Sequence, residues 1–251
     1  MREQGRVLLK DKKIVVTGGA RGLGRAFAEA AIAAGAHVAI ADVLEERGRE
    51  TAKETGAHFA KIDLASPESI ESGMGLCAAA LGGIDGLINN GAIATGIGGK
   101  TMEDIDIATW DSVMTVNVRG TWLATRAALP WLRQSGQGKV VNIASDTALW
   151  GAPRLMHYVA SKGAIISMSR SMARELGMHG IAVNCIAPGL TLVEATEYVP
   201  AERHQQYVSG RAINRAQHPD DICGAVLFLL SDAASFVTGQ LLPVNGGFVM
   251  N

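Results

Sequence analysis

The chain has 251 residues, 48% of them hydrophobic, which is enough for one large α/β domain or two small ones. Its 23 Lys and Arg residues balance 24 Asp and Glu residues, so the charge gives no indication of a nucleic-acid partner. No apolar run is long enough to span a bilayer, and residues 1–13 contain no apolar segment of a secretory signal.

The cysteines, histidines and glycines of the sequence indicate what kind of protein this is. Cys77, Cys185 and Cys223 have neither metal-ligand nor disulfide spacing, which is typical of reduced structural thiols in a cytoplasmic protein. The six histidines form no ligand cluster, so no metal is expected. Glycine is frequent, 30 residues of 251, or about 12% against a typical ~7%. Because no repeat absorbs this excess, it predicts tight turns, including phosphate-binding loops.

Short apolar runs alternate along the chain with stretches of helical periodicity. The expected strands are 13–17, 37–41, 58–62, 86–90, 139–144 and 181–187. The expected helices between them include 22–35, 67–82, 117–134 and 157–178. Nearly continuous apolar strands separated by helices are typical of a parallel sheet with helices on both faces. Since no linker interrupts the chain, the sequence predicts a single α/β domain over residues 1–251, with a doubly wound sheet.

A glycine-rich turn follows the first expected strand. The sequence "TGGARGLG" (17–24) places Gly18, Gly22 and Gly24 between a strand and a helix. Glycines there allow a tight turn and a close approach to a diphosphate, and the helix N-terminus supplies free N–H groups. This context predicts a dinucleotide site.

An acidic residue ends the second expected strand. Asp42 lies where a carboxylate can accept hydrogen bonds from both ribose hydroxyls and repel a 2′-phosphate, which favours NAD over NADP. Arg21, in the glycine turn, is suited to a phosphate and is an argument for NADP. Asp63 ends the third strand, and it either contacts the adenine or caps the next helix. Because Ser66 and Pro67 already form a good cap, Asp63 is left for a ligand.

A tyrosine and a lysine four residues apart lie on one expected helix. In "MHYVASKGA" (156–164), this spacing places Tyr158 and Lys162 on one helix face. Ser145 directly follows the fifth strand, where ligands bind in open α/β sheets. A nearby ammonium and the positive nicotinamide ring of a bound cofactor favour the phenolate, so we expect Lys162 together with that ring to lower the pKa of Tyr158.

Over essentially its whole length the sequence resembles the short-chain dehydrogenase/reductase family. The matching pieces stand in family order: "TGGARGLG" (17–24), Asp42, Asp63, "NNGA" (89–92), Asn117 in "VNVRG", Ser145, Tyr158 with Lys162, "PGLT" (188–191) and the closing stretch 228–247. The resemblance implies a Rossmann fold and an oxidoreductase that transfers a hydride between NAD(H) and an alcohol or ketone.

The resemblance also implies roles for individual residues. Tyr158 would exchange a proton with the substrate oxygen, which Ser145 would hold, while Lys162 would bind the nicotinamide ribose. Asn117 would hold a water that links Lys162 to solvent, or would instead satisfy helix backbone. The residues implied for cofactor binding are Gly18, Arg21, Gly22, Leu23, Gly24, Asp42, Val43, Asp63, Leu64, Asn90, Gly91, Tyr158, Lys162, Pro188, Gly189 and Thr191.

The sequence departs from the family at two places near the expected cofactor. The family usually has Asn-Asn-Ala-Gly where this chain has "NNGA", so Ala92 would be strained if that position needs a positive φ. The family often has threonine where Val193 stands, and the backbone of Thr191 would then serve the carboxamide instead.

The substrate end of the site is less clearly marked. Residues 191–215 are polar and interrupted by Pro200, which predicts a mobile flap over the substrate. The candidate pocket walls are Trp150, Met156 and Leu190, and their polar neighbours are Asp146, Thr147 and His157. Trp150 suits core packing or an oligomer contact equally well. His157 is expected to be structural. A mostly apolar pocket suggests a medium-sized secondary alcohol or ketone.

Three readings of the function therefore stand. The first is an NAD(H)-dependent alcohol dehydrogenase or ketone reductase with a small-molecule substrate. The second is an NADPH-dependent 3-oxoacyl-thioester (acyl carrier protein) reductase, against which Asp42 argues. The third is a non-catalytic NAD-sensing protein, which need not keep Ser145, Tyr158 and Lys162 together.

The helices expected around 117–134 and 157–178 also carry broad apolar faces. These faces include Trp122, Trp131, Met168 and Met172, more than one sheet face can cover. By resemblance they pair between subunits, so a homotetramer or homodimer is expected.

Overall fold

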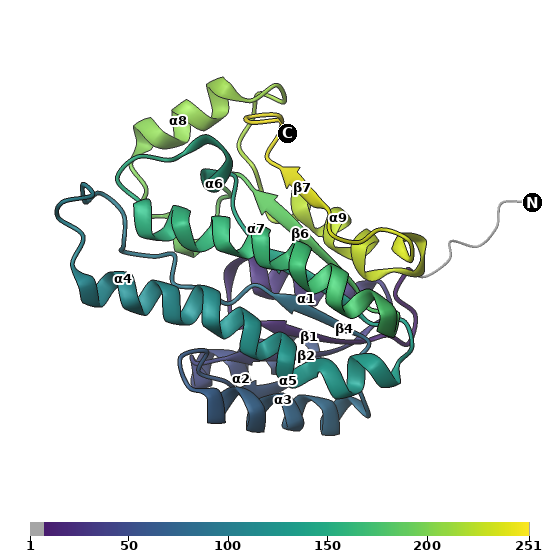
Figure 1. The fold of residues 1–251 in the computed structure, drawn as a ribbon. Coiled ribbons are helices and arrows are strands. Elements are labelled where there is room, and N and C mark those ends of the chain that lie inside the picture. Colours follow the sequence, from purple (N-terminus) through teal and green to yellow (C-terminus); the bar gives the residue numbers. More distant parts are fainter. Residues whose placement is uncertain (1–7, 251) are drawn as a thin grey trace, which may run out of the picture.

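The computed structural model describes residues 8–250 and contains one parallel sheet (Figure 1). The prediction that no secretory signal is present draws partly on residues 1–7, which lie outside this range. Within it, seven strands stand in the order β3-β2-β1-β4-β5-β6-β7. They are β1 (Lys13–Thr17), β2 (His37–Asp42), β3 (His58–Lys61), β4 (Gly86–Asn89), β5 (Lys139–Ile143), β6 (Ala182–Pro188) and β7 (Leu241–Val244).

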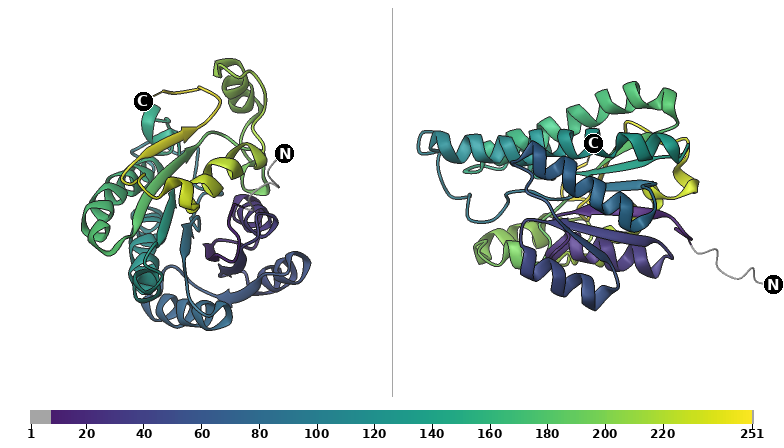
Figure 2. Two further views of the ribbon diagram at one scale, coloured as in Figure 1. Left: turned by 90° about the vertical axis from the view of Figure 1, so that its right-hand side faces the viewer. Right: turned by 90° about the horizontal axis from the view of Figure 1, so that it is seen from below.

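Helices cover both faces of this sheet, as Figure 2 shows. Helices α3, α5 and α7 lie on one face, and α1, α2 and α9 lie on the other. The α-helices are α1 (Gly22–Ala33), α2 (Glu45–Thr55), α3 (Pro67–Leu81), α4 (Ile107–Val113), α5 (Thr121–Gln134), α6 (Thr147–Trp150), α7 (Met156–Leu176), α8 (Ala201–Gly210) and α9 (Asp220–Leu230). A π-helix, η1 (Met114–Gly120), joins α4 to α5, and short 3₁₀ turns are η2 (Gly177–His179), η3 (Glu194–Thr196) and η4 (Asp232–Ala234).

Both faces of the central strands are buried, as the apolar runs predict. On β1, Val15 packs toward α3 and α5, whereas Ile14 and Val16 pack toward α1 and α9. Successive side chains of a strand point to opposite faces, so a strand buried on both sides is apolar throughout. The predicted fold class, a single doubly wound parallel sheet, is confirmed.

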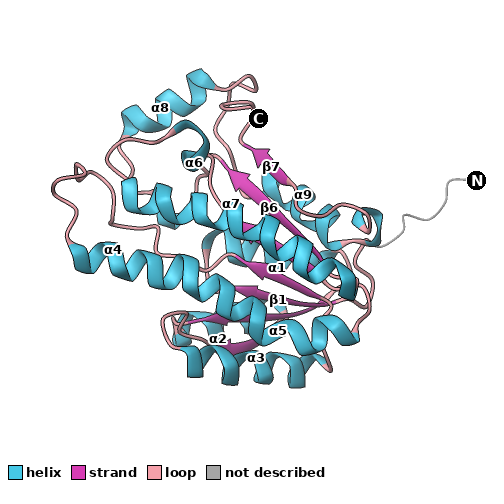
Figure 3. Ribbon diagram, in the orientation of Figure 1, coloured by secondary structure: helices cyan, strands magenta, loops and turns pink. Residues whose placement is uncertain are grey.

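The elements match the predicted ones closely (Figure 3). Each of the six predicted strands occurs with its ends shifted by no more than one residue. The predicted cap also occurs, since the Ser66 hydroxyl accepts the N–H of Ser69 and Pro67 begins α3. The helix predicted at 117–134 is different, because its first turn belongs to the π-helix η1. No helix within residues 8–250 is long and apolar enough to cross a membrane.

The order of the strands determines where a ligand can bind. The chain leaves β1 toward β2 and β3 on one side of the sheet and then returns to place β4 on the other side. The loops after β1 and β4 therefore diverge and leave a crevice at the carboxyl ends of these strands. In Figures 1 and 3 the strand arrows point to the side where α6, α8 and the start of α4 lie.

Gly24 allows α1 to pack directly on the turn that precedes it. A Cβ added at Gly24 would lie 1.9 Å from the carbonyl oxygen of Gly18 and 2.6 Å from Nδ2 of Asn90. The backbone oxygen cannot move without opening the turn, so only glycine fits here.

We expect Gly24→Ala to lower the free energy of unfolding by more than about 2 kcal/mol, because the added methyl group overlaps backbone. Chemical denaturation measures this change. Gly75→Ala is the matched control, since no atom lies near its added Cβ, and alanine should stabilise that helix position by about 0.5–1 kcal/mol. Equal stability of the two variants would contradict the packing argument.

Candidate active site

One cavity of about 920 Å³ lies at the carboxyl ends of the strands. Its wall contains residues at or just beyond the ends of β1, β2, β4, β5 and β6, among them Gly18, Asp42, Asn90, Ser145 and Pro188. This is the crevice that the strand order creates. The cavity is large enough for a dinucleotide portion and a small substrate together.

Nearly all of the predicted site residues line this one cavity. They are Gly18, Arg21, Gly22, Leu23, Asp42, Val43, Asp63, Leu64, Asn90, Gly91, Ser145, Tyr158, Lys162, Pro188, Gly189 and Thr191. Gly24 and Asn117 are the two that do not line it. Gly24 lies behind the turn, and Asn117 lies behind the loop after β4, so both contribute to its wall indirectly.

The glycine turn and the loop after β4 are packed backbone to backbone. Gly18 has φ of 65° and Gly22 has φ of 55°, both in the left-handed region that favours glycine. A Cβ on Gly91 would lie 2.7 Å from Cδ1 of Leu64 and 3.2 Å from the N atom of Gly18. The open N-terminus of α1 and this bare backbone form a cradle that suits a diphosphate.

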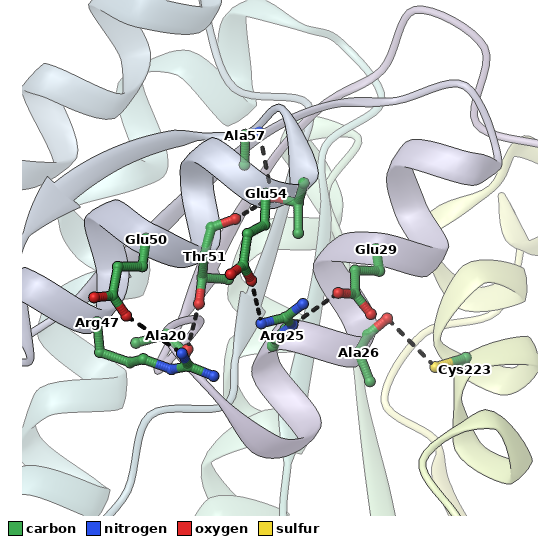
Figure 4. Close-up of polar contacts among 11 residues, drawn as sticks. Ala20, Arg25, Ala26, Glu29, Arg47, Glu50, Thr51, Glu54, Ala57 and Cys223 are labelled. Atoms are coloured by element: carbon green, nitrogen blue, oxygen red, sulfur yellow. Dashed lines mark hydrogen bonds and ion pairs between the residues drawn. The ribbon is translucent and has the colours of Figure 1, made fainter.

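Helix α2 holds the glycine turn from outside (Figure 4). The hydroxyl of Thr51 donates to the carbonyl oxygen of Ala20 at 2.7 Å. Arg25, on α1, bridges to Glu29 at 2.8 Å and to Glu54 of α2 at 2.7 Å. A second bond runs from Cys223 Sγ to the Ala26 carbonyl and links α9 to α1. The bond from Thr51 to Ala20 links α2 to the glycine turn.

Asp42 is fixed by backbone donors and keeps capacity for a ligand. Its Oδ2 accepts the N–H of Ala20 and its Oδ1 accepts the N–H of Leu44, both at 3.0 Å. A carboxylate has about four acceptor sites, so about two remain for hydroxyl groups. The site therefore suits a ribose with two free hydroxyls.

Asp63 is only partly free for a ligand. Its Oδ1 accepts the N–H of Ala65 at 2.8 Å, while Ser66 caps α3 as predicted. The carboxylate lines the cavity beside Leu64 and retains acceptor capacity there.

Ser145, Tyr158 and Lys162 come together beyond β5. The Ser145 Oγ accepts hydrogen bonds from the N–H of Thr147 at 3.3 Å and from its hydroxyl at 2.9 Å. Lys162 Nζ donates to the carbonyl oxygen of Ile143 at 2.8 Å and lies 5.6 Å from the centroid of the Tyr158 ring. The shared helix face predicted for the tyrosine and lysine is thus observed.

The predicted effect of Lys162 on Tyr158 is wrong for the chain by itself. Burial raises the pKa of the Tyr158 phenol, and the Ser145 side chain opposes this rise only in part. Burial also lowers the pKa of the Lys162 ammonium to about 8. Desolvation disfavours the charged form of both groups and is the largest cause of both shifts. The prediction also included the positive nicotinamide ring, which is not part of the chain.

Asn117 is buried and bonded to protein groups. Its Oδ1 accepts the N–H of Ile93 at 2.8 Å, and its Nδ2 donates to the Ile93 carbonyl and to the Ser161 hydroxyl, both at 3.1 Å. The π-helix η1 directs this side chain between the loop after β4 and α7. Asn117 therefore fixes one wall of the cavity through loop backbone and a serine hydroxyl rather than through helix backbone, and the water-holding role stays a prediction.

Two of the predicted pocket walls lie elsewhere. Leu190 lines the cavity, but Met156 is exposed and Trp150 packs edge-on against Tyr207 and Phe248. This agrees with the core-packing alternative for Trp150. His157 is fully buried away from the cavity wall, as expected of a structural residue.

Asp146 forms a buried network next to Ser145. The Tyr207 hydroxyl donates to Asp146 at 3.0 Å and accepts from Nε1 of Trp150 at 3.2 Å. Burial raises the pKa of the Asp146 carboxyl to about 6. Tyr207 is the one residue of α8 that is buried. Its bond to Asp146 therefore ties α8 to the residue that follows Ser145.

The segment predicted as a flap forms much of the substrate end. It contains η3 and α8, and its Thr191, Val193, Tyr198, Arg203 and Tyr207 line the cavity. Sequence reasoning missed Arg203 and Tyr207, although their spacing of four on a helix was a usable signal. Arg154 was also missed, and nothing in its sequence context marks it.

The two family departures cause no strain. Within residues 8–250, Asp11 and Arg154 are the non-glycine residues with positive φ, so Ala92 is not strained. Val193 lines the cavity with an apolar side chain, and Thr191 lies beside it.

The three cysteines are free and buried, and no group of His, Cys, Asp or Glu within the described range could hold a metal ion.

Comparison with known proteins finds relatives over nearly the whole chain. The chain matches the family described as "Enoyl-(Acyl carrier protein) reductase" over residues 18–249. It is 37% identical to 2-(S)-hydroxypropyl-CoM dehydrogenase 3 of Xanthobacter autotrophicus, over 95% of this chain and 97% of that protein. It is 35% identical to 3-alpha-(or 20-beta)-hydroxysteroid dehydrogenase of Mycobacterium tuberculosis, over 95% and 89%. It is 33% identical to the 3-oxoacyl-(acyl-carrier-protein) reductase of Aquifex aeolicus, over 96% and 98%.

The raised pKa of Asp146 predicts a pH dependence of stability. The folded chain binds this proton more tightly than the unfolded chain, whose carboxyl has the ordinary value of 3.8. The proton on Asp146 therefore stabilises the folded chain by up to about 3 kcal/mol. This stabilisation is full below about pH 4 and is lost as the pH rises through about 6. Unfolding free energies measured across this range should therefore fall for the wild type relative to Asp146→Asn.

Asp221→Asn is the control of opposite sign. The Arg215 guanidinium lowers the pKa of Asp221 to about 2, so the wild type should lose stability relative to that variant only in strong acid. Parallel stability curves for the wild type and Asp146→Asn between about pH 4 and pH 7 would contradict the burial argument.

Proposed function

Because the chain belongs to the short-chain dehydrogenase/reductase family, we propose that it transfers a hydride between NAD(H) and a secondary alcohol or ketone. It is an oxidoreductase that acts on CH–OH groups, as its relatives are. The observation that carries the finer proposal is that Asp42, Ser145, Tyr158 and Lys162 line a single cavity.

The cavity wall suits a nicotinamide dinucleotide. Asp42 accepts the ribose hydroxyls at one end, and the bare backbone of Gly18 and Gly91 lets the diphosphate approach. When bound, the cofactor supplies the hydride donor or acceptor. Lys162, which donates to the Ile143 carbonyl, holds the ribose nearest the reacting carbon and Thr191 serves the carboxamide.

Ser145 and Tyr158 act on the substrate oxygen. The Ser145 Oγ accepts from two groups of Thr147, so its own proton remains available to donate to the substrate oxygen. Tyr158 gives its proton to that oxygen in ketone reduction and takes it back in alcohol oxidation. Since burial raises the pKa of Tyr158, the phenol is in the acid form at neutral pH and can give its proton in ketone reduction.

The second candidate is an NADPH-dependent 3-oxoacyl-thioester reductase. It is supported by the Aquifex aeolicus relative and by Arg21 in the glycine turn. Asp42 argues against it, because its carboxylate would face the 2′-phosphate of NADPH at short range. The non-catalytic sensor loses support, because Ser145, Tyr158 and Lys162 remain together in the cavity wall.

Three further properties are proposed from the sequence. A mobile flap at residues 191–215, a homotetramer or homodimer, and a cytoplasmic location all fit this function. Trp122 remains 46% exposed on α5, which agrees with a subunit contact there.

We expect Tyr158→Phe to lower kcat by about 10³-fold, within the range of general acid–base catalysis, while NADH still binds. Nicotinamide absorbance measures turnover and protein-to-NADH fluorescence transfer measures binding. Tyr198→Phe, which also removes a hydroxyl at the cavity, should keep most of its activity because that hydroxyl is donated to the Ala94 carbonyl. Full activity in Tyr158→Phe would exclude the assigned proton donor.

We expect Asp42→Asn to raise the ratio of kcat/KM for NADP⁺ over NAD⁺ by at least about tenfold, since a like charge is removed. Asparagine still accepts one backbone N–H, so the loop should keep its shape. Initial rates at varied cofactor concentration give the ratio. A wild type that already prefers NADPH with an acetoacetyl thioester would favour the second candidate.

A further inference from the structure

Two arginines stand at the substrate end of the cavity. Arg154, in the loop between α6 and α7, and Arg203, in the first turns of α8, both line its wall beyond Ser145. The other charged groups of this end are engaged elsewhere: Asp146 accepts from Tyr207, and Lys162 donates to a carbonyl. The two guanidiniums are thus the charges that a substrate's remote end would meet.

Neither guanidinium has a carboxylate partner within residues 8–250. Other arginines of the chain do form ion pairs with Asp or Glu, namely Arg25, Arg47, Arg49 and Arg215. A guanidinium offers five donors in a fixed fork that matches a carboxylate, sulfonate or phosphate. Two guanidiniums without carboxylate partners in one cavity wall are suited to binding an anion.

Arg203 is held in place by its neighbours. Its guanidinium carbon lies 5.5 Å from the centroid of the Trp150 ring, and that indole is bonded to Tyr207. Tyr207 is in turn bonded to Asp146, which follows Ser145. The charge of Arg203 is therefore positioned relative to the serine through three buried or half-buried groups. Pro200, at the start of α8, also lines the cavity, so the positive end of that helix faces the same space.

Arg154 reaches the same end from the opposite loop. Its φ of 58° is in the left-handed region, which is uncommon for a residue with a side chain. Its carbonyl oxygen accepts the N–H of Gly99 at 3.0 Å, which fixes this turn at the rim of the cavity.

We propose that Arg154 and Arg203 form an anion subsite, and that the substrate is a secondary alcohol or ketone with an anionic group remote from the reacting carbon. This inference rests on the proposed function and names its substrate class. A carboxylate, a sulfonate and a phosphate share the required chemistry, and the test below separates them.

The test compares methyl carbinols of increasing chain length that end in a carboxylate, a sulfonate, a phosphate or an uncharged carboxamide. At the best chain length, the wild type should show a kcat/KM about 10- to 100-fold higher for one anion than for the amide, as charge-assisted hydrogen bonds predict. Arg203→Gln and Arg154→Gln should each remove most of this ratio and leave turnover of the amide nearly unchanged. Constant ionic strength keeps screening the same throughout.

Arg126→Gln is the matched control. Arg126 also lies over a tryptophan ring, at 5.0 Å from that of Trp122, but it is not in the cavity wall. It should keep the wild-type ratio. A ratio near one at every chain length, or a ratio that both cavity variants retain, would overturn the subsite.

A second measurement separates failure of the subsite from failure of the proposed function. Calorimetry of the NADH-loaded protein with alkanesulfonates and alkanecarboxylates measures anion binding without turnover. If no alcohol or ketone is turned over but the anion binds and Arg203→Gln weakens it about tenfold or more, the subsite stands and the proposed function fails. Anion binding that neither arginine variant changes would reject the subsite whatever the activity.

Discussion

The contact of the first glycine turn with its own helix is the constraint on which the cavity depends. The Gly18 carbonyl lies so close to Gly24 that a Cβ there would be 1.9 Å away. This contact sets the direction in which α1 leaves the sheet, and Thr51 and Arg25 hold α2 against it. Asp42 takes its position from the same turn, through the N–H of Ala20. The backbone cradle proposed for the diphosphate and the carboxylate proposed for the ribose are thus parts of one packed unit.

Burial determines the chemistry of the opposite end. Tyr158, Lys162 and Asp146 are each shifted toward the neutral form, the first and last with raised pKa values and the lysine with a lowered one. These three groups together contribute little net charge near neutral pH, so the positive charge of this end comes from Arg154 and Arg203. A charged ligand therefore changes the protonation of its surroundings more than it would at an exposed surface.

The sequence was sufficient for the fold and for bringing the glycine turn, Asp42 and Asp63 to one cavity wall. Strands buried on both faces have an unmistakable apolar pattern, and the glycine turn with Asp42 is local in the chain. The substrate end could not be predicted equally well, because Arg154 and Tyr198 come from loops, and the spacing of Arg203 and Tyr207 predicts a shared helix face without telling what that face lines. For Trp150 the sequence left a pocket wall and core packing open, since it does not tell which side of a short helix faces inward, and the side chain packs on Tyr207. The pKa of Tyr158 also depends on burial, which only the tertiary structure determines.

The single buried residue of α8 has a consequence for how the cavity exchanges its contents. A helix held by one anchored tyrosine can detach locally, at a small fraction of the free energy of global unfolding, while the sheet stays intact. Its backbone amides should then exchange with solvent far faster than those of α7, which buries residues along its whole length. Entry and release of ligand would follow the kinetics of this local opening, on the microsecond-to-millisecond scale of such motions.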